Sequence, residues 1–185
     1  MFESAELGHT IDKETFKKEV PKLRAALLDV QYDMLEKKDF PVIILISGVD
    51  GSGKGETINL LYSWMDPRHI STLAFSAPTD EERARPHMWR YWRALPPKGE
   101  IGIFAGSWYS QPIADRIAGK MRRTAMDERI DDINRFEAML LNEGALLLKF
   151  WFHLSKDGQK QRLKTLEKDP RTAWRVTKES YDRLK

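Results

Sequence analysis

Hydrophobic and polar residues alternate along this chain with two different periods, and each period predicts a kind of element. Four short segments are mostly apolar and suit strands: 42–47, 69–75, 100–104 and 145–153. Helical spacing is found in the segments 13–38, 54–65, 111–122, 127–142, 156–168 and 172–184. A leading helix followed by alternating strands and helices predicts an α/β layer fold with a parallel sheet.

Three segments refine this prediction. The continuously apolar run 42–47 is typical of a central parallel strand that is buried on both faces. Pro21 should split or kink the first helix, because proline lacks the N–H that a helix interior uses. Thr79 or Asp80 is the expected N-cap of another helix, which Pro86 should break.

Composition and charge narrow the function classes. At 185 residues the chain fits one domain with a full core, and it has no cysteine, which excludes disulfides and thiolate metal sites. We expect a cytoplasmic protein without a membrane span. A net charge of +3 is too small to indicate nucleic-acid binding. Basic residues nevertheless cluster in two segments, 83–93 and 156–175, which suits a polyanionic substrate.

The candidate chemistry lies directly after the apolar run 42–47. Residues 48–55 read GVDGSGKG, a glycine-rich turn between a strand and a helix. In such a phosphate-binding loop (P-loop), glycines let backbone N–H groups converge on phosphate oxygens and the lysine adds a positive charge. We therefore predict phosphate contacts from Lys54 and from four loop glycines, Gly48, Gly51, Gly53 and Gly55.

The loop departs from the general pattern G-x-x-x-x-G-K-[ST] at one position. Gly55 stands where a Ser or Thr hydroxyl usually helps to hold Mg²⁺. Asp50 offers a carboxylate within the same loop, and we predict it as the Mg²⁺ ligand. An Asx turn that caps the loop is the alternative role of Asp50.

Longer motifs carry a family resemblance. Residues 77–82 read APTDEE, 89–101 read WRYWRALPPKGEI, 104–111 read FAGSWYSQ and 152–163 read FHLSKDGQKQRL. With the P-loop, these motifs resemble the polyphosphate kinase 2 family over about residues 10–185. The resemblance implies a three-layer P-loop kinase fold, a basic helical lid, Mg²⁺ as cofactor, and phosphoryl transfer between inorganic polyphosphate and nucleotides.

The chain departs from this family at the end of the third predicted strand. Active members typically carry Asp-Arg-Ser-Trp-Tyr-Asn-Arg there, whereas residues 105–111 read AGSWYSQ. The Asp, both Arg and the Asn are therefore replaced. Because phosphoryl transfer depends on metal and cationic side chains that neutralise the reacting phosphates, we expect catalysis to be weakened or absent while phosphate binding survives.

The resemblance also suggests how a degenerate site is tolerated. One class of the family fuses two kinase modules and phosphorylates nucleoside monophosphates, chiefly AMP to ADP. We expect this chain to be the amino-terminal module of such a protein, cut short, or part of a homo-oligomer. Its expected organisation is a helical extension over 1–40, a P-loop core over 41–155 and a lid over 156–185.

The remaining candidate residues are arginines. The resemblance places Arg90 and Arg93 near the substrate channel, and Arg162 and Arg175 in the lid, while Arg116 could reach phosphate. Two other functions stay open: a non-catalytic polyphosphate-binding or structural module, and an ATP-dependent nucleoside monophosphate kinase. The latter rests on the P-loop, which is similar to that of thymidylate kinases.

Overall fold

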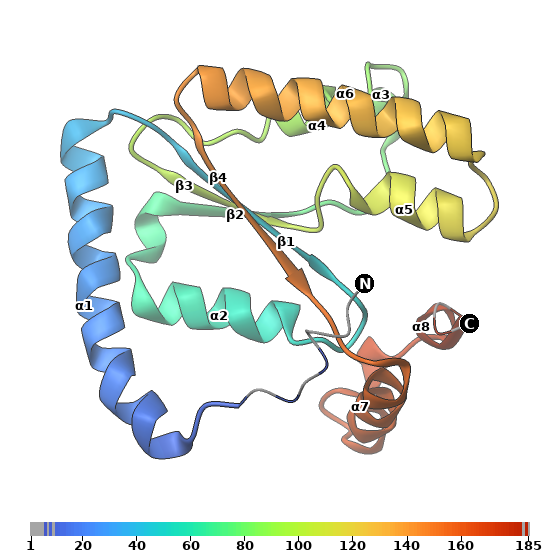
Figure 1. Ribbon diagram of the computed structural model, residues 1–185, viewed down its shortest axis with the longest axis horizontal. Helices are drawn as coiled ribbons and strands as arrows, with labels where there is room; N and C mark the ends of the chain where they lie inside the picture. Colours follow the sequence, from blue (N-terminus) through green and yellow to red (C-terminus); the bar gives the residue numbers. More distant parts are fainter. Residues whose placement is uncertain (1–5, 7, 9, 183, 185) are drawn as a thin grey trace.

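The protein folds as an α/β structure around one parallel sheet (Figure 1). The computed structural model describes residues 6, 8, 10–182 and 184. Its strands are β1 (Val42–Gly48), β2 (Ile70–Ala74), β3 (Ile101–Ala105) and β4 (Leu146–Phe152). Its α-helices are α1 (Lys13–Lys37), α2 (Lys54–Trp64), α3 (Asp80–Arg83), α4 (Trp89–Trp92), α5 (Ser110–Ile117), α6 (Arg123–Asn142), α7 (Lys156–Lys168) and α8 (Lys178–Asp182), with 3₁₀ turns η2 (Pro67–His69) and η3 (Ala173–Arg175).

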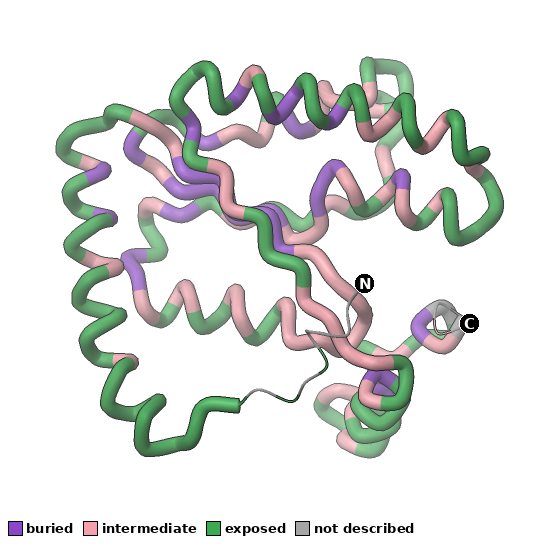
Figure 2. The backbone as a smooth tube through the Cα atoms, in the orientation of Figure 1, coloured by how far each residue is buried: buried purple, intermediate pink, exposed green. Residues whose placement is uncertain are grey.

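The sheet has the strand order β2-β3-β1-β4, and all pairs are parallel. Side chains alternate along β1: Ile43 and Leu45 pack with Trp108 and residues of α6, whereas Ile44 and Ile46 pack with Met34 and Met65 on the other face. Helices α1 and α2 therefore cover one face, and α4 and α6 the other (Figures 1 and 2). This confirms the predicted three-layer fold.

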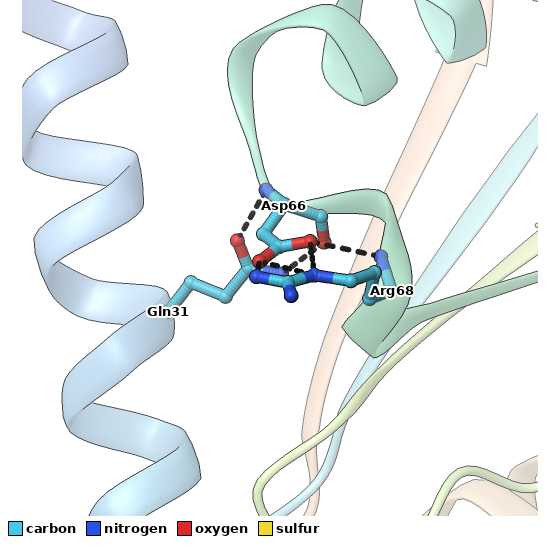
Figure 3. Close-up of polar contacts among 3 residues, drawn as sticks. All are labelled: Gln31, Asp66 and Arg68. Carbon is cyan, nitrogen blue, oxygen red and sulfur yellow. Dashed lines mark hydrogen bonds and ion pairs between the residues drawn. The ribbon is translucent and has the colours of Figure 1, made fainter.

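A buried polar contact fastens α1 to the connection between α2 and β2 (Figure 3). Gln31, which is 1% exposed, donates from Nε2 to the carbonyl of Asp66 and accepts from its N–H, both at 2.8 Å. The Asp66 carboxylate in turn accepts hydrogen bonds from the backbone and side chain of Arg68. One glutamine thus satisfies both backbone groups of a residue that would otherwise be buried unpaired.

Two expectations about proline have different outcomes. Helix α1 runs through Pro21, so the predicted split is wrong; the residue whose carbonyl loses its partner, Lys17, lies on the exposed side of the chain, where water can replace the missing bond. The break at Pro86 is confirmed, because α3 ends at Arg83 and α4 begins at Trp89.

The predicted helix over 172–184 is also wrong. Its described residues, 172–182 and 184, include the short turn η3 and the five-residue α8 instead. Thr172 bends the chain back onto the end of α7, since its Oγ1 donates to the carbonyl of Leu166 at 2.7 Å and its N–H donates to that of Asp169 at 2.8 Å. Within the described residues, no helix is both long enough and apolar enough to cross a membrane.

Candidate phosphate-binding site

The P-loop connects β1 to α2, as predicted. Gly48, Gly51 and Gly53 have φ values of 142°, 78° and 95°, a region that favours glycine. Gly48 is needed for a second reason: a Cβ there would collide with the backbone of Phe152 at the end of β4. The loop is thereby held against β4, and the N–H of Val49 donates to the carbonyl of Phe152 at 3.1 Å.

Lys54 begins α2 and folds back over the loop. Its Nζ donates to the carbonyls of Gly48 at 2.9 Å and of Val49 at 2.7 Å, so the positive charge is placed at the loop's entrance. The next residue, Gly55, is exposed, and a Cβ built on it would touch nothing within 4 Å. The Thr57 hydroxyl donates to the carbonyl of Gly53 at 3.1 Å.

Helix α7 of the predicted lid faces this loop across an open cleft of about 440 Å³. The cleft is lined by Gly51, Ser52, Gly53, Leu154, Gly158, Gln161, Arg162 and Thr165. The stem of Arg162 approaches closely, since a Cβ on Gly51 would lie 3.2 Å from its Cγ. Arg175 forms an ion pair with Glu56 of α2 at 3.3 Å. The structure therefore brings two predicted lid arginines to the P-loop and the helix that follows it.

The carboxyl end of β3 lies beside the P-loop strand. Ala105 is the last residue of β3 and is in register with Ile46 of β1. Gly106 follows with φ 77°, and its N–H donates to the carbonyl of Ile46 at 3.0 Å. The hydroxyls of Ser107 and Ser47 then meet at 3.1 Å, directly before Gly48. A carboxylate side chain at position 105 would lie next to the loop, but this chain has alanine there.

A buried carboxylate supports this turn, and sequence reasoning missed it. Glu137 of α6 accepts hydrogen bonds from Trp108 Nε1 at 2.9 Å and from the Tyr109 hydroxyl at 2.8 Å, and its other oxygen accepts from Lys149 of β4 at 2.8 Å. The bond to Glu137 raises the pKa of Lys149, and burial followed by the Glu137 contact raises the pKa of Tyr109.

The other predicted arginines bind within their own segments. Arg90 pairs with Glu82 at 3.3 Å, donates to the carbonyl of Ser76 and lies over the ring of Phe75. Arg93 lies over the ring of Trp89. Arg116 is exposed and donates to the carbonyl of Met121 at 3.4 Å. Their contact with substrate stays a prediction.

Asp50 lies half-buried in the loop and is the carboxylate predicted to bind Mg²⁺. Among the residues that the structure describes, no group of three or more His, Asp or Glu side chains is placed to hold a metal ion. Magnesium usually keeps several waters and takes one or two carboxylates together with substrate phosphates. A loop with one carboxylate therefore fits a metal ion that arrives with phosphate.

These features define a class of protein. A P-loop after a central parallel strand, facing a basic helix across a cleft, is the arrangement of a kinase-like phosphate-binding fold. The family model described as polyphosphate kinase 2 matches residues 10–185, and the chain belongs to this family.

Two relatives that are named for their activity agree with this family. The polyphosphate:AMP phosphotransferase of Pseudomonas aeruginosa is 54% identical over 190 residues, which cover 100% of this chain and 38% of that protein. The polyphosphate:AMP phosphotransferase of Pseudomonas syringae is 52% identical over 96% of this chain and 36% of its own length. This chain thus spans little more than a third of these two relatives.

Solved structures give the same result. A candidate polyphosphate kinase 2 from Pseudomonas aeruginosa PA01 superposes with a TM-score of 0.86 at 53% identity, over 100% of this chain and 38% of that one. Polyphosphate kinase 2 from Arthrobacter aurescens TC1 has a TM-score of 0.89 at 27% identity, over 96% of this chain and 64% of that one.

Proposed function

We propose that this chain is the phosphate-binding module of a polyphosphate:AMP phosphotransferase, which transfers phosphate from inorganic polyphosphate to AMP and gives ADP. The cleft between the P-loop and α7 carries this proposal. It places Gly51 and Gly53, both with positive φ, opposite Arg162, and Lys54 directly follows Gly53, which suits a chain of phosphates. The relatives at 54% and 52% identity bear the name of this activity.

Mg²⁺ is the proposed cofactor, with Asp50 as its protein ligand and polyphosphate oxygens as the others. Bound there, the ion would neutralise charge on the phosphates. Gly55 supplies no hydroxyl and Ala105 no carboxylate to this metal site. We therefore propose that the module binds polyphosphate well and transfers phosphate poorly.

The same proposal concerns the rest of the protein. The relatives extend well beyond the matched region, which supports a second fused kinase module as the place of catalysis, or assembly with another copy. The exposed side chains of Leu146, Phe150 and Trp151 on edge strand β4 support contact of this edge with further polypeptide. The cytoplasmic location predicted from the absence of cysteine stays part of this proposal.

Calorimetric titration with inorganic triphosphate and Mg²⁺ tests the binding. Lys54→Ala should weaken binding about 10- to 150-fold, the effect of losing a hydrogen bond to a charged group. Lys22→Ala is the matched control, because Lys22 pairs only locally with Glu19 on exposed α1. Equal affinity of wild type and Lys54→Ala would overturn the assignment of the loop.

An assay of ADP formation tests the chemistry. AMP with polyphosphate should give little ADP with the wild-type chain, and the double change Ala105→Asp with Gly106→Arg should increase it. ATP replaces polyphosphate in a parallel assay. Faster turnover with ATP than with polyphosphate would favour a nucleoside monophosphate kinase and contradict the proposed donor.

A further inference from the structure

Glu137 of α6 contacts residues from both sides of the P-loop strand. Strand β1, which leads into the P-loop, lies between β3 and β4. From α6, the Glu137 carboxylate reaches both flanking strands: one oxygen holds the turn after β3 through Trp108 and Tyr109, and the other holds Lys149 of β4. A single side chain therefore bridges the two neighbours of the P-loop strand.

The bridge continues to the loop itself. Trp108 and Tyr109 directly follow Ser107, whose hydroxyl lies 3.1 Å from that of Ser47. Ser47 is the residue before Gly48, whose carbonyl accepts a hydrogen bond from Lys54. Three hydrogen bonds, joined by the backbone at residues 107–108 and 47–48, thus connect Glu137 to the entrance of the loop.

Burial makes this connection rigid. The Glu137 side chain is 9% exposed, and Trp108 and Ser107 are 0% and 1% exposed. The Trp108 ring also packs edge-on against Phe136 and Phe104. Because the bond from Trp108 to the Glu137 carboxylate is charge-assisted and enclosed, we expect the turn to move little relative to β1.

We infer that Glu137 is a positioning residue of the phosphate site: it fixes the turn after β3, and through the Ser107–Ser47 contact it sets the P-loop for polyphosphate. This inference rests on the proposed phosphate-binding function. Glu137 does not touch the phosphate. It acts by holding the loop in the conformation that binds, so that less of the binding energy is spent on ordering it.

Three variants test this inference by calorimetry with inorganic triphosphate and Mg²⁺. Glu137→Gln keeps the shape of the side chain but replaces the carboxylate oxygen near Lys149 with an amide group. We expect the affinity for triphosphate to fall about 3- to 30-fold, the range of indirect couplings between residues. Ser107→Ala removes the hydroxyl that reaches Ser47 and should weaken binding similarly. The double variant should lose less than the product of the two single losses, because both act through one path.

Glu128→Gln is the matched control, because it removes a carboxylate from an exposed position of the same helix and should leave affinity unchanged. Unfolding midpoints are measured for every variant, and all titrations are made well below them. If Glu137 only stabilised the fold, Glu137→Gln would lower the unfolding midpoint and leave the affinity for triphosphate unchanged. The reason is that the protein is fully folded under the titration conditions.

Hydrogen exchange gives a second readout. Loop amides over 48–53 should exchange faster in Glu137→Gln and in Ser107→Ala than in Glu128→Gln. If Glu137→Gln binds triphosphate as wild type does, or if the losses of the two single variants multiply fully, the inference is wrong. If wild type itself does not bind triphosphate, the proposed function fails instead, and the loop exchange rates still decide whether Glu137 positions the loop.

Discussion

At the scale of single residues, the predicted departures from the family's motif lie at Gly55, Ala105 and Gly106, and their surroundings differ. Gly55 has open space around it, and Ala105 stands in register beside the P-loop strand. Gly106, however, has a backbone conformation that a side chain would strain. The three positions therefore respond differently to restoration, and each response can be measured.

Gly55→Ser should be tolerated and should make triphosphate binding more dependent on Mg²⁺. The new Cβ meets no atom within 4 Å, and replacing glycine in the first turn of α2 should raise stability by up to about 0.5–1 kcal/mol. The measurement is the affinity for triphosphate with and without Mg²⁺. Gly55→Ala is the control, since it gains the same stability without the hydroxyl. An identical Mg²⁺ response in both variants would contradict the metal assignment.

Gly106→Arg should destabilise the fold by about 1–2 kcal/mol, the cost of a left-handed conformation for a residue with a Cβ. Crowding contributes little, because that Cβ would lie 3.5 Å from Ser110 Oγ and 3.9 Å from the carbonyl oxygen of Phe75. Gly106→Asn should lose less, since asparagine adopts this conformation more readily. Urea unfolding measures both, and equal losses for Arg and Asn would show that crowding and not backbone strain decides the stability.

At the scale of elements, the strand and helix order followed from hydrophobic periodicity because burial on two faces leaves a clear pattern in β1. The connections between elements left no such pattern. Glu137, Tyr109 and Lys149 are 12 to 40 positions apart in sequence, so no local spacing indicates their contact. The segment 172–184 was mispredicted as one helix for a similar reason, because the side-chain hydrogen bonds of Thr172 to the end of α7 override helical spacing.

The ion pair between Asp66 and Arg68, at the contact of α1 with the α2–β2 connection, should weaken in acid. Hydrogen bonds from the Arg68 side chain, then from its backbone, lower the pKa of Asp66 from 3.8 to about 2. Because the folded state holds this proton less tightly than the unfolded chain, the stabilisation is complete above about pH 5 and is lost as the pH falls from about 4 to 2.

Urea unfolding of wild type and Asp66→Asn between pH 7 and pH 2 measures this contribution. The difference in stability should be constant above about pH 5 and should shrink towards pH 2 as the wild-type carboxylate is protonated. Arg68→Met should reduce this pH dependence without abolishing it, since it removes the side-chain hydrogen bonds that lower the pKa of Asp66 most and keeps the backbone hydrogen bond. A difference that persists unchanged at pH 2 would show that the ion pair is not responsible.

At the scale of the whole molecule, α7 and η3 close over the carboxyl edge of the sheet, where α7 continues directly from β4 (Figure 1). Contacts between this predicted lid and the P-loop region include Arg162 against Gly51, and Arg175 with Glu56. The Arg175 and Glu56 side chains are 46% and 55% exposed, so solvent screens their attraction. The Arg175–Glu56 pair is therefore a weak contact of the predicted lid, whereas Leu163 of α7 is buried.

Glu56→Gln should open the lid more often without unfolding the protein. An exposed ion pair contributes about 0.2–1 kcal/mol, so trypsin should cleave near Arg171 and Arg175 about 1.5- to 5-fold faster while the unfolding midpoint hardly changes. Raising the salt concentration should speed cleavage of wild type and have less effect on the variant, because salt screens the pair that the variant lacks.

The matched control is Glu19→Gln, which breaks an exposed pair with Lys22 inside α1 and leaves the lid contacts intact. Triphosphate should slow cleavage of both wild type and Glu56→Gln, since phosphate between the P-loop and Arg162 would draw the lid closed. Because Lys54 is the proposed anchor of the ligand at the loop, Lys54→Ala should abolish this protection. Protection that survives in Lys54→Ala would place triphosphate on the basic lid alone, outside the cleft with the P-loop.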